Sequence, residues 1–304
     1  MIKIKNLIKK QKNKHLIVEK GVSTTLLIIA SISILASIGI VLTLLIDSVN
    51  FFKEVPLSQV FSTKLAPLKA KDPSFGFLPL IVGTFTTSII AMIVAVPIGL
   101  GAAMFISEFA SKKVRKIVKP ILEVLAGIPT IVYGFFAYSF VTPLLMKIIP
   151  ELGSKNALSP GIVMGIMIIP IVTSLSEDAM NAVPSSLREG AYGLGSTKLE
   201  VSTKVIIPAA ISGIMASFVL ALSRAIGETM IVTIASGSSK KFTLDITQSM
   251  QTMTSYIVEF TSGDAGSGTV GYYSLYAVGL ILFIFTMLMN MLVKYITKKY
   301  RREY

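Results

Sequence analysis

Two oppositely charged side chains lie inside an otherwise apolar stretch of the sequence. Arg224 and Glu228 are four residues apart within the apolar run 206–236. Residues four apart share one face of a helix, so the two side chains are predicted to contact each other. A charge within a membrane helix costs at least about 2.5–3.5 kcal/mol on insertion scales, so two such charges need a reason. A guanidinium offers planar, paired donors that fit the oxygens of a tetrahedral oxyanion.

Two interpretations of this pair remain open. It could be a structural ion pair that joins two helices. It could instead face a polar pathway, where Arg224 would meet an anion and Glu228 would orient the guanidinium and temper its charge, so that the anion can leave. Ser223 and Thr229 flank the pair and are weaker candidates for the same pathway.

The composition indicates that these residues lie in a membrane protein. Of the 304 residues, 53% are hydrophobic and only 15% are charged, whereas about a quarter of the residues of a soluble domain are charged. The apolar content also excludes a disordered chain. We therefore predict an all-α membrane protein with about six transmembrane helices. The apolar runs are 24–46, 80–106, 120–146, 160–175, 206–236 and 272–296.

The run 24–46 follows a basic segment, 1–23, and a signal peptide has the same order. The run is longer than the roughly 7–15 apolar residues of a signal peptide and no A-x-A-like site follows it, so we predict an uncleaved first helix. The predicted organisation is then a basic tail, a first transmembrane helix, an external loop, a five-helix core and a second basic tail. Their ranges are 1–23, 24–46, 47–79, 80–296 and 297–304, and a cytoplasmic loop at 184–208 lies within the core.

The net charge of +13 could reflect nucleic-acid binding, solubility or membrane orientation. With both termini inside, 20 of the 29 Lys and Arg residues fall in cytoplasmic segments and eight in external ones, with Arg224 inside a span. This distribution predicts cytoplasmic termini, with anionic lipid as a neighbour, and does not fit nucleic-acid binding. There is no cysteine, the single histidine, His15, lies in the basic tail, and no glycine precedes a lysine. Cysteine chemistry, a metal site and a Walker A motif are therefore not predicted.

The segment 184–208 has the start and stop signals of two short helices. Ser186 with Glu189, and Thr197 with Glu200, have the spacing of capping boxes, and Gly193 and Gly195 separate them. The segment could lie on the membrane surface as an amphipathic loop, or it could be a rigid projection that docks into a soluble partner.

Other polar segments have simpler interpretations. The external stretch 237–271 could contain a helix at 244–260 that touches a partner, or it could be a solvated loop. Glu108 and Glu123 flank a basic loop, where charge balance is favoured over a gating role. Glu177 and Asp178 are interpreted as a solvated helix end.

The loop carries a first resemblance. Glu189, Gly190 and Ala191, then Gly195, then the Ile-Pro pair at 207–208 resemble the EAA loop of ABC importer permeases, with Gly190 in place of the first Ala of that pattern. The resemblance implies that this loop couples the chain to a separate ATP-hydrolysing subunit.

A second resemblance is more specific. ALSRAIGETM, which contains Arg224 and Glu228, with LAGIPTIVYGFF at 125–136 and FGFLPLIVGTFTTSIIA at 75–91, is similar to the permeases of the phosphate-specific (Pst) ABC importer, C-type subunit. It implies a type I ABC importer permease fold and a non-catalytic subunit in a prokaryotic cell membrane, with Arg224 and Glu228 associated with phosphate transport. The implied partners are a second permease, two ATPase subunits that use ATP and Mg, and an external phosphate-binding protein.

Three alternatives remain at this point. The chain could be a permease for another oxyanion such as molybdate or sulfate, because one arginine separates tetrahedral anions poorly. An anion transporter driven by an ion gradient would explain Arg224 and Glu228 but not the capped loop. A membrane sensor or scaffold would need neither charge.

Overall fold

The computed structural model describes residues 2–69, 72–264, 266 and 268–300, and these are mostly helical. A small antiparallel sheet pairs β1 (Leu65–Ala66) with β2 (Ser74–Phe75). Short π-helical segments, η1 (Phe105–Phe109), η2 (Ala137–Val141) and η3 (Val201–Ile206), interrupt or end several helices. The α-helices are α1 Ile2–Glu54, α2 Leu57–Val60, α3 Leu78–Met104, α4 Lys112–Gly127, α5 Thr130–Phe136, α6 Thr142–Met146, α7 Leu158–Asn181, α8 Ser185–Gly193, α9 Lys198–Glu200, α10 Ile207–Ala209, α11 Ile211–Ile226, α12 Met230–Ala235, α13 Met253–Glu259 and α14 Val270–Tyr300.

The helices supply the predicted membrane spans in two forms. Four helical stretches of the described chain, 21–54, 78–109, 158–181 and 270–298, are long and apolar enough to cross a membrane. Two further spans are bent: 112–127 meets 130–146 at 88°, and 198–209 meets 211–226 at 73°. Counting each bent pair as one span gives six, in agreement with the sequence prediction.

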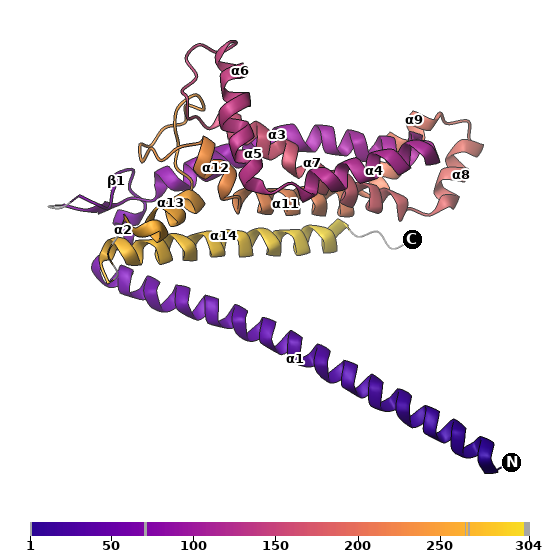
Figure 1. The fold of residues 1–304 in the computed structure, drawn as a ribbon. Coiled ribbons are helices and arrows are strands. Elements are labelled where there is room, and N and C mark those ends of the chain that lie inside the picture. The colour runs from indigo at the N-terminus through magenta and orange to yellow at the C-terminus, as the bar shows by residue number, and fades with distance from the viewer. Residues whose placement is uncertain (1, 70–71, 265, 267, 301–304) are drawn as a thin grey trace.

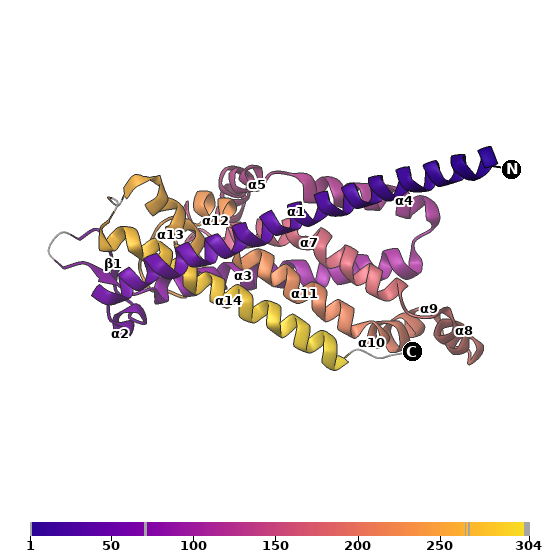
Figure 2. The ribbon, with the colours of Figure 1, turned by 90° about the horizontal axis from the view of Figure 1, so that it is seen from below.

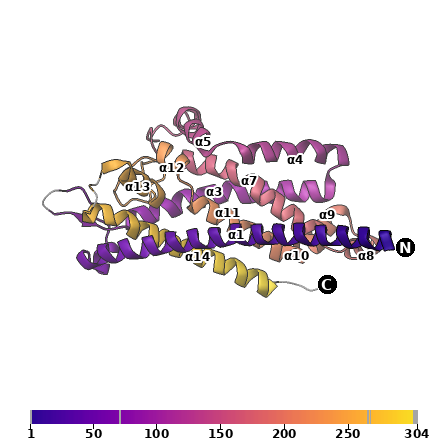
Figure 3. The same ribbon diagram turned by 60° about the horizontal axis from the view of Figure 1, so that its bottom comes forward.

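The helices α3, α7 and α11 form the centre of the bundle (Figure 1). Helix α14 packs on α11, and α1 packs on α14 near one end of the molecule and then diverges from the bundle. Helices α4 and α5 lie on the side opposite α1 and α14 (Figure 3). The start of α1, the end of α14 and the pair α8–α9 lie at one end, and the small sheet with α2 and α13 lies at the other (Figures 1 and 2).

Glycines set the contact between α3 and α7. A Cβ atom on Gly165 would lie 2.7 Å from Val94 Cβ, and one on Gly161 would lie 2.7 Å from Ile90 Cβ. Only glycine allows the two backbones to come this close, and such close packing replaces the hydrophobic driving force that lipid does not provide.

Three predicted boundaries differ from the structure. The predicted third span, 120–146, bends sharply at Ile128–Pro129, because Pro129 is held at φ −58° and ψ 136° between α4 and α5. The predicted fifth span, 206–236, starts with η3 and α10 and ends its main helix at Ile226. Helix α1 extends beyond the predicted span 24–46 at both ends, because no proline occurs between residue 2 and Val55 and its two glycines have ordinary helical φ values.

The packing of α3 on α7 makes a testable prediction. Gly165→Ala should destabilise the protein by about 1–3 kcal/mol, the usual effect of overpacking a tight contact. Thermal unfolding of the purified protein in detergent measures this. Gly101→Ala is the matched control, because a Cβ there has no neighbour within 4 Å. Equal melting temperatures for the two variants would contradict the proposed role of Gly165.

Candidate functional site

The charged pair lies at a break between two helices. Helix α11 ends at Ile226 and α12 begins at Met230, so Gly227, Glu228 and Thr229 connect them. Arg224 Nη1 donates to Glu228 Oε2 at 2.8 Å. The predicted contact is therefore confirmed, although Glu228 reaches Arg224 from the connecting segment and not from a continuous helix.

The buried carboxylate of Glu228 is fully engaged. The exposed fraction of its side chain is 2%, and Oε1 accepts hydrogen bonds from the backbone N–H groups of Met230 (3.1 Å) and Ile231 (3.4 Å). These N–H groups have no partner within α12 because they lie in its first turn. One carboxylate oxygen of Glu228 thus accepts from the α12 backbone, and the other accepts from Arg224.

A returning segment, which the sequence did not indicate as part of this site, holds the break from the other side. Thr254 of α13 donates through Oγ1 to the backbone oxygen of Glu228 at 2.6 Å. Thr84 of α3 accepts from the backbone N–H of Met253 at 2.9 Å. A Cβ on Gly83 would lie only 2.3 Å from the backbone oxygen of Gln251, so glycine is needed where α3 passes this segment. In the sequence, the only sign of this close contact was the run of mostly small and polar residues at 83–88, GTFTTS.

The predicted helix at 244–260 is therefore only partly correct. Helix α13 spans Met253–Glu259, and residues 244–252 are not helical. Tyr256 is fully buried and donates to or accepts from Ser274 at 2.7 Å. This part of 237–271 is core structure that packs against α3 and α14, since its backbone is bonded to Thr84 and to Ser236 and not only to water.

Arg224 presents an open guanidinium. The exposed fraction of its side chain is 42%, and within the described part of the chain its hydrogen-bond partner is Glu228 alone. The remaining N–H groups are free to bind an oxyanion. The neighbouring Ser223 hydroxyl is buried without a protein partner, and half-buried Thr229 bonds only its own connecting segment and α12.

The loop between α7 and α11 folds as two short helices. Helix α8 ends in a Schellman motif: Ser196 N–H bonds the Ala191 oxygen (3.2 Å), Gly195 N–H bonds the Tyr192 oxygen (2.9 Å), and Gly195 has φ +83°. Thr197 and Glu200 form the predicted capping box at the start of α9. The predicted box of Ser186 and Glu189 is wrong, because Pro184 occupies the N-cap position and α8 starts at Ser185.

The tip of this loop exposes apolar side chains. Leu194 is 89% exposed, and Tyr192 and Leu199 are also exposed. Glu189 and Gly190 lie on the exposed face of α8, while Ala191 is half-buried. Apolar groups on a polar projection are typical of a protein contact site.

The cap of α9 is electrostatically stable. The backbone N–H of Thr197, then Lys204, hold the pKa of the Glu200 carboxyl at about 2, below its usual 4.5. A depressed pKa means that the capping contribution is complete above pH 4.5 and is lost as the pH falls from there toward 2. The cap is therefore intact at neutral pH.

Comparison with known sequences assigns the chain to a family. Residues 95–302 match the binding-protein-dependent transport system inner membrane component. The chain belongs to this family. The match covers the bent spans, the charged pair and the loop, so these are features of an importer permease.

Several relatives cover most of this permease. A probable ABC transporter permease protein, YqgH, of Bacillus subtilis is 34% identical over 75% of this chain and 74% of the relative. The phosphate transport system permease protein PstC of Mesorhizobium japonicum is 35% identical over 84% of this chain and 83% of the relative.

Solved structures confirm the type I ABC importer permease fold. A bacterial alginate ABC transporter, in complex with its alginate pentasaccharide-bound periplasmic protein, has a TM-score of 0.58 at 17% identity, covering 84% of this chain and 87% of that one. The inward-facing MetNI methionine ABC transporter has a TM-score of 0.55 at 15% identity, covering 75% and 95%. The permease is thus a non-catalytic, multi-pass protein of the bacterial inner membrane.

The structure corrects, for Glu177, the interpretation of residues 177–178 as a solvated helix end. Glu177 is not solvated: its side chain is 2% exposed and pairs with Lys119 at 2.9 Å, because α4 lies over this end of α7. Its neighbour Asp178 is exposed. No group of three or more His, Cys, Asp or Glu side chains within the described chain could hold a metal ion.

The α9 cap makes a testable prediction. Thr197→Ala removes the side-chain acceptor for the Glu200 N–H and should weaken the first turn by about 0.5–2 kcal/mol. Hydrogen exchange of the Glu200 and Val201 amides should accelerate accordingly. Thr203→Ala is the control, because that hydroxyl bonds only the Leu199 oxygen of the preceding turn. Unchanged exchange in Thr197→Ala would show that the cap does not stabilise the loop.

Proposed function

We propose that this permease forms half of the membrane path of an ATP-driven importer of inorganic phosphate, with Arg224 as its anion-contacting residue. The observation that carries the proposal is the half-exposed guanidinium of Arg224, held by the buried carboxylate of Glu228 at a helix break. The names of relatives such as the phosphate permease of Mesorhizobium japonicum support phosphate as the substrate.

The two members of the pair have different roles. Glu228 is buried, so it acts on the substrate only through Arg224, whose orientation and net charge it sets. Arg224 is left with donors in a fixed plane, which match two oxygens of a tetrahedral anion. Compensation of its charge by Glu228 keeps the anion from being trapped, since a transport site must release what it binds. Ser223 and Thr229, which flank the pair in the sequence, are the further candidates for the path.

The energy comes from a separate subunit. No glycine in the chain precedes a lysine, so the phosphate-binding Walker A sequence is missing from it. The α8–α9 projection, with Glu189, Gly190, Ala191 and Gly195, would dock in an ATPase subunit that uses ATP and Mg, with the exposed Leu194 as its apolar contact. A second permease completes the path, and an external phosphate-binding protein delivers the anion. The α8–α9 projection, the start of α1 and the end of α14 lie at one end of the bundle (Figure 1), and we assign this end to the cytoplasm.

The proposed cycle follows from this arrangement. Closure of the ATPases on ATP would draw the two projections together and open the path toward the binding protein. Hydrolysis would return the path to the inward-open form. The permease contributes a switchable path and a weak anion site, and performs no chemistry itself.

Transport in proteoliposomes tests the function. The permease is reconstituted with its partner permease, ATPases and binding protein. Phosphate uptake should be vanadate-sensitive and survive a protonophore, and excess molybdate or sulfate should not compete. Uptake abolished by the protonophore would indicate a gradient-driven transporter. Competition by molybdate or sulfate would indicate another oxyanion.

Substitution of the pair tests the site. Arg224→Ala should lower uptake at least tenfold in a complex that assembles normally, whereas Lys116→Ala, which removes an exposed base of α4, should not. The double variant Arg224→Met with Glu228→Gln removes both charges and keeps an oxygen for the α12 N–H groups. A structural ion pair can often be replaced in this way without loss, so normal uptake by either variant would contradict the role of Arg224.

A further inference from the structure

Arg188 of the α8–α9 projection is fixed to the ends of two membrane helices. Its guanidinium donates to the backbone oxygens of Met180 (2.7 Å) and Val183 at the end of α7 and pairs with Glu108 of η1 at 3.2 Å. Cations are favoured at a helix C-terminus, where carbonyl oxygens lack partners. Lys198 also lies 5.3 Å from the ring centre of Phe109. Movement of the projection therefore either breaks these contacts or displaces the ends of α3 and α7 with it.

The contacts continue from Glu108 to the middle of α4. The Ser107 hydroxyl lies between two acceptors, Glu108 Oε1 at 2.9 Å and Asn181 Oδ1 at 3.1 Å, and its single proton is donated to one of them at a time. Asn181 Nδ2 donates to Glu177 Oε1 at 3.2 Å, and Lys119 Nζ pairs with the same oxygen at 2.9 Å. One continuous polar chain thus joins α8 to α4. We call it the inner relay: Arg188, Glu108, Ser107, Asn181, Glu177 and Lys119.

The acids of the inner relay bind their bases firmly. The side chains of Glu108 and Glu177 are 7% and 2% exposed. A buried carboxylate that loses its partner is strongly unfavourable, so each acid must keep its base or exchange it for another donor. In contrast, α4 buries none of its own residues. Its position over α7 therefore depends on few contacts, of which Lys119–Glu177 is the one beside the cavity.

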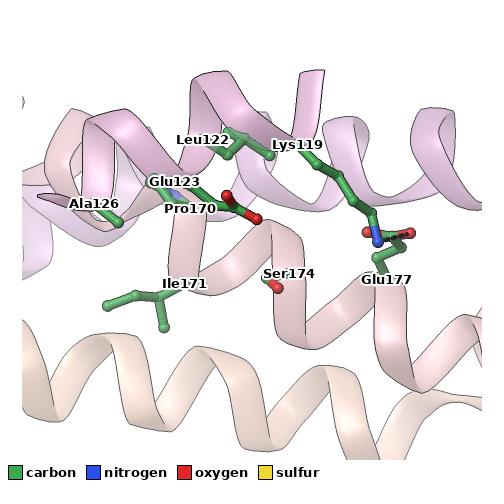
Figure 4. A pocket seen from close by; sticks show the side chains of 8 residues that line it. All are labelled: Lys119, Leu122, Glu123, Ala126, Pro170, Ile171, Ser174 and Glu177. Carbon is green, nitrogen blue, oxygen red and sulfur yellow. Dashed lines mark ion pairs between the residues drawn. The ribbon is translucent and has the colours of Figure 1, made fainter. Parts of the chain in front are cut away.

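A cavity separates α4 from α7 at this point. Its volume is about 320 Å³, and Lys119 and Glu123 reach into it from α4, with Ser174 and Glu177 on α7 (Figure 4). The 88° bend at Ile128–Pro129 is the junction about which α4 would turn, and the Tyr133 hydroxyl donates across it to the Leu125 oxygen at 2.8 Å. Arg115 also ties the start of α4 to the Ser107 oxygen at 2.7 Å.

We propose that the inner relay transmits the position of the α8–α9 projection to α4, so that movement of the projection opens or closes the α4–α7 cavity. Glu177 and Asn181 are positioning residues in this device and do not touch the substrate. The relay rests on the proposed function, because the projection moves only if an ATPase subunit drives it. Beyond that function, the proposal names the side chains that carry the movement to the inner half of the path.

Spin-label distances in the assembled complex test the relay. The chain contains no cysteine, so introduced cysteines are its only labelling sites. One pair of labels replaces Lys116 on α4 and Leu175 on α7, and a second pair replaces the exposed Ser186 on α8 and Leu175. Both distances should change between the nucleotide-free and vanadate-trapped states. In Glu177→Gln the α8 distance should still change, whereas the α4 change should be lost or reduced at least twofold.

Asp178→Asn is the matched control, because Asp178 is the exposed neighbour of Glu177 and should leave both changes intact. If the distance between the α4 and α7 labels changes as much in Glu177→Gln as in the unsubstituted complex, the relay is overturned. The contacts would then only hold α4 in place. The readout depends on nucleotide and not on the transported anion. Failure of the relay can therefore be separated from failure of phosphate uptake, which is measured on the same unlabelled complex.

A coupling ratio gives an independent check. Glu177→Gln should lower the phosphate transported per ATP hydrolysed at least threefold while ATP hydrolysis stays within twofold. The double variant Arg188→Lys with Lys119→Met should lose no more uptake than the stronger single variant, because both act through one chain of contacts. Additive losses would contradict the proposal.

Discussion

A charge in an apolar medium must keep a partner, and this constraint organises the permease. Two carboxylates, Glu228 and Glu177, are each 2% exposed, and each is held by a base that is only partly buried, Arg224 (42% exposed) and Lys119 (45% exposed). The acid is fixed by further hydrogen bonds from the protein in both cases, so the base is held at a defined place with part of its surface open. One pair lies at the break beyond α11, and the other lies beside the cavity under α4.

The same constraint explains why helix breaks occur where they do. Exposed backbone groups in lipid are costly, so a broken span persists only where side chains satisfy it. The break at Gly227–Thr229 meets this condition through the Glu228 carboxylate on one side and Thr254 on the other. The segment that contains α13 is therefore part of the site, since it closes the break while the Arg224 side chain remains 42% exposed.

The sequence predicted much of this from local rules. Apolar runs indicated six spans, spacing indicated the Arg224–Glu228 contact, and the glycines with the Thr197–Glu200 box indicated the two-helix loop. It did not predict the partner of Glu177, the contact of Thr254 with the break, or the anchoring of Arg188. These contacts join segments far apart in the chain, whereas periodicity and capping patterns report only on neighbours within a few residues. The capping box predicted for Ser186 and Glu189 was wrong for a local reason. Helix α8 begins at Ser185 with Pro184 as its N-cap, so Ser186 lies inside the helix.

The central claim is that Arg224 contacts the transported anion. A structure of the assembled complex with phosphate trapped in the path tests it most directly. The account predicts phosphate oxygens within hydrogen-bond distance of the free N–H groups of Arg224, with Glu228 still bonded to the first turn of α12. Phosphate bound elsewhere, with Arg224 enclosed in a contact between helices, would contradict it and identify the pair as structural.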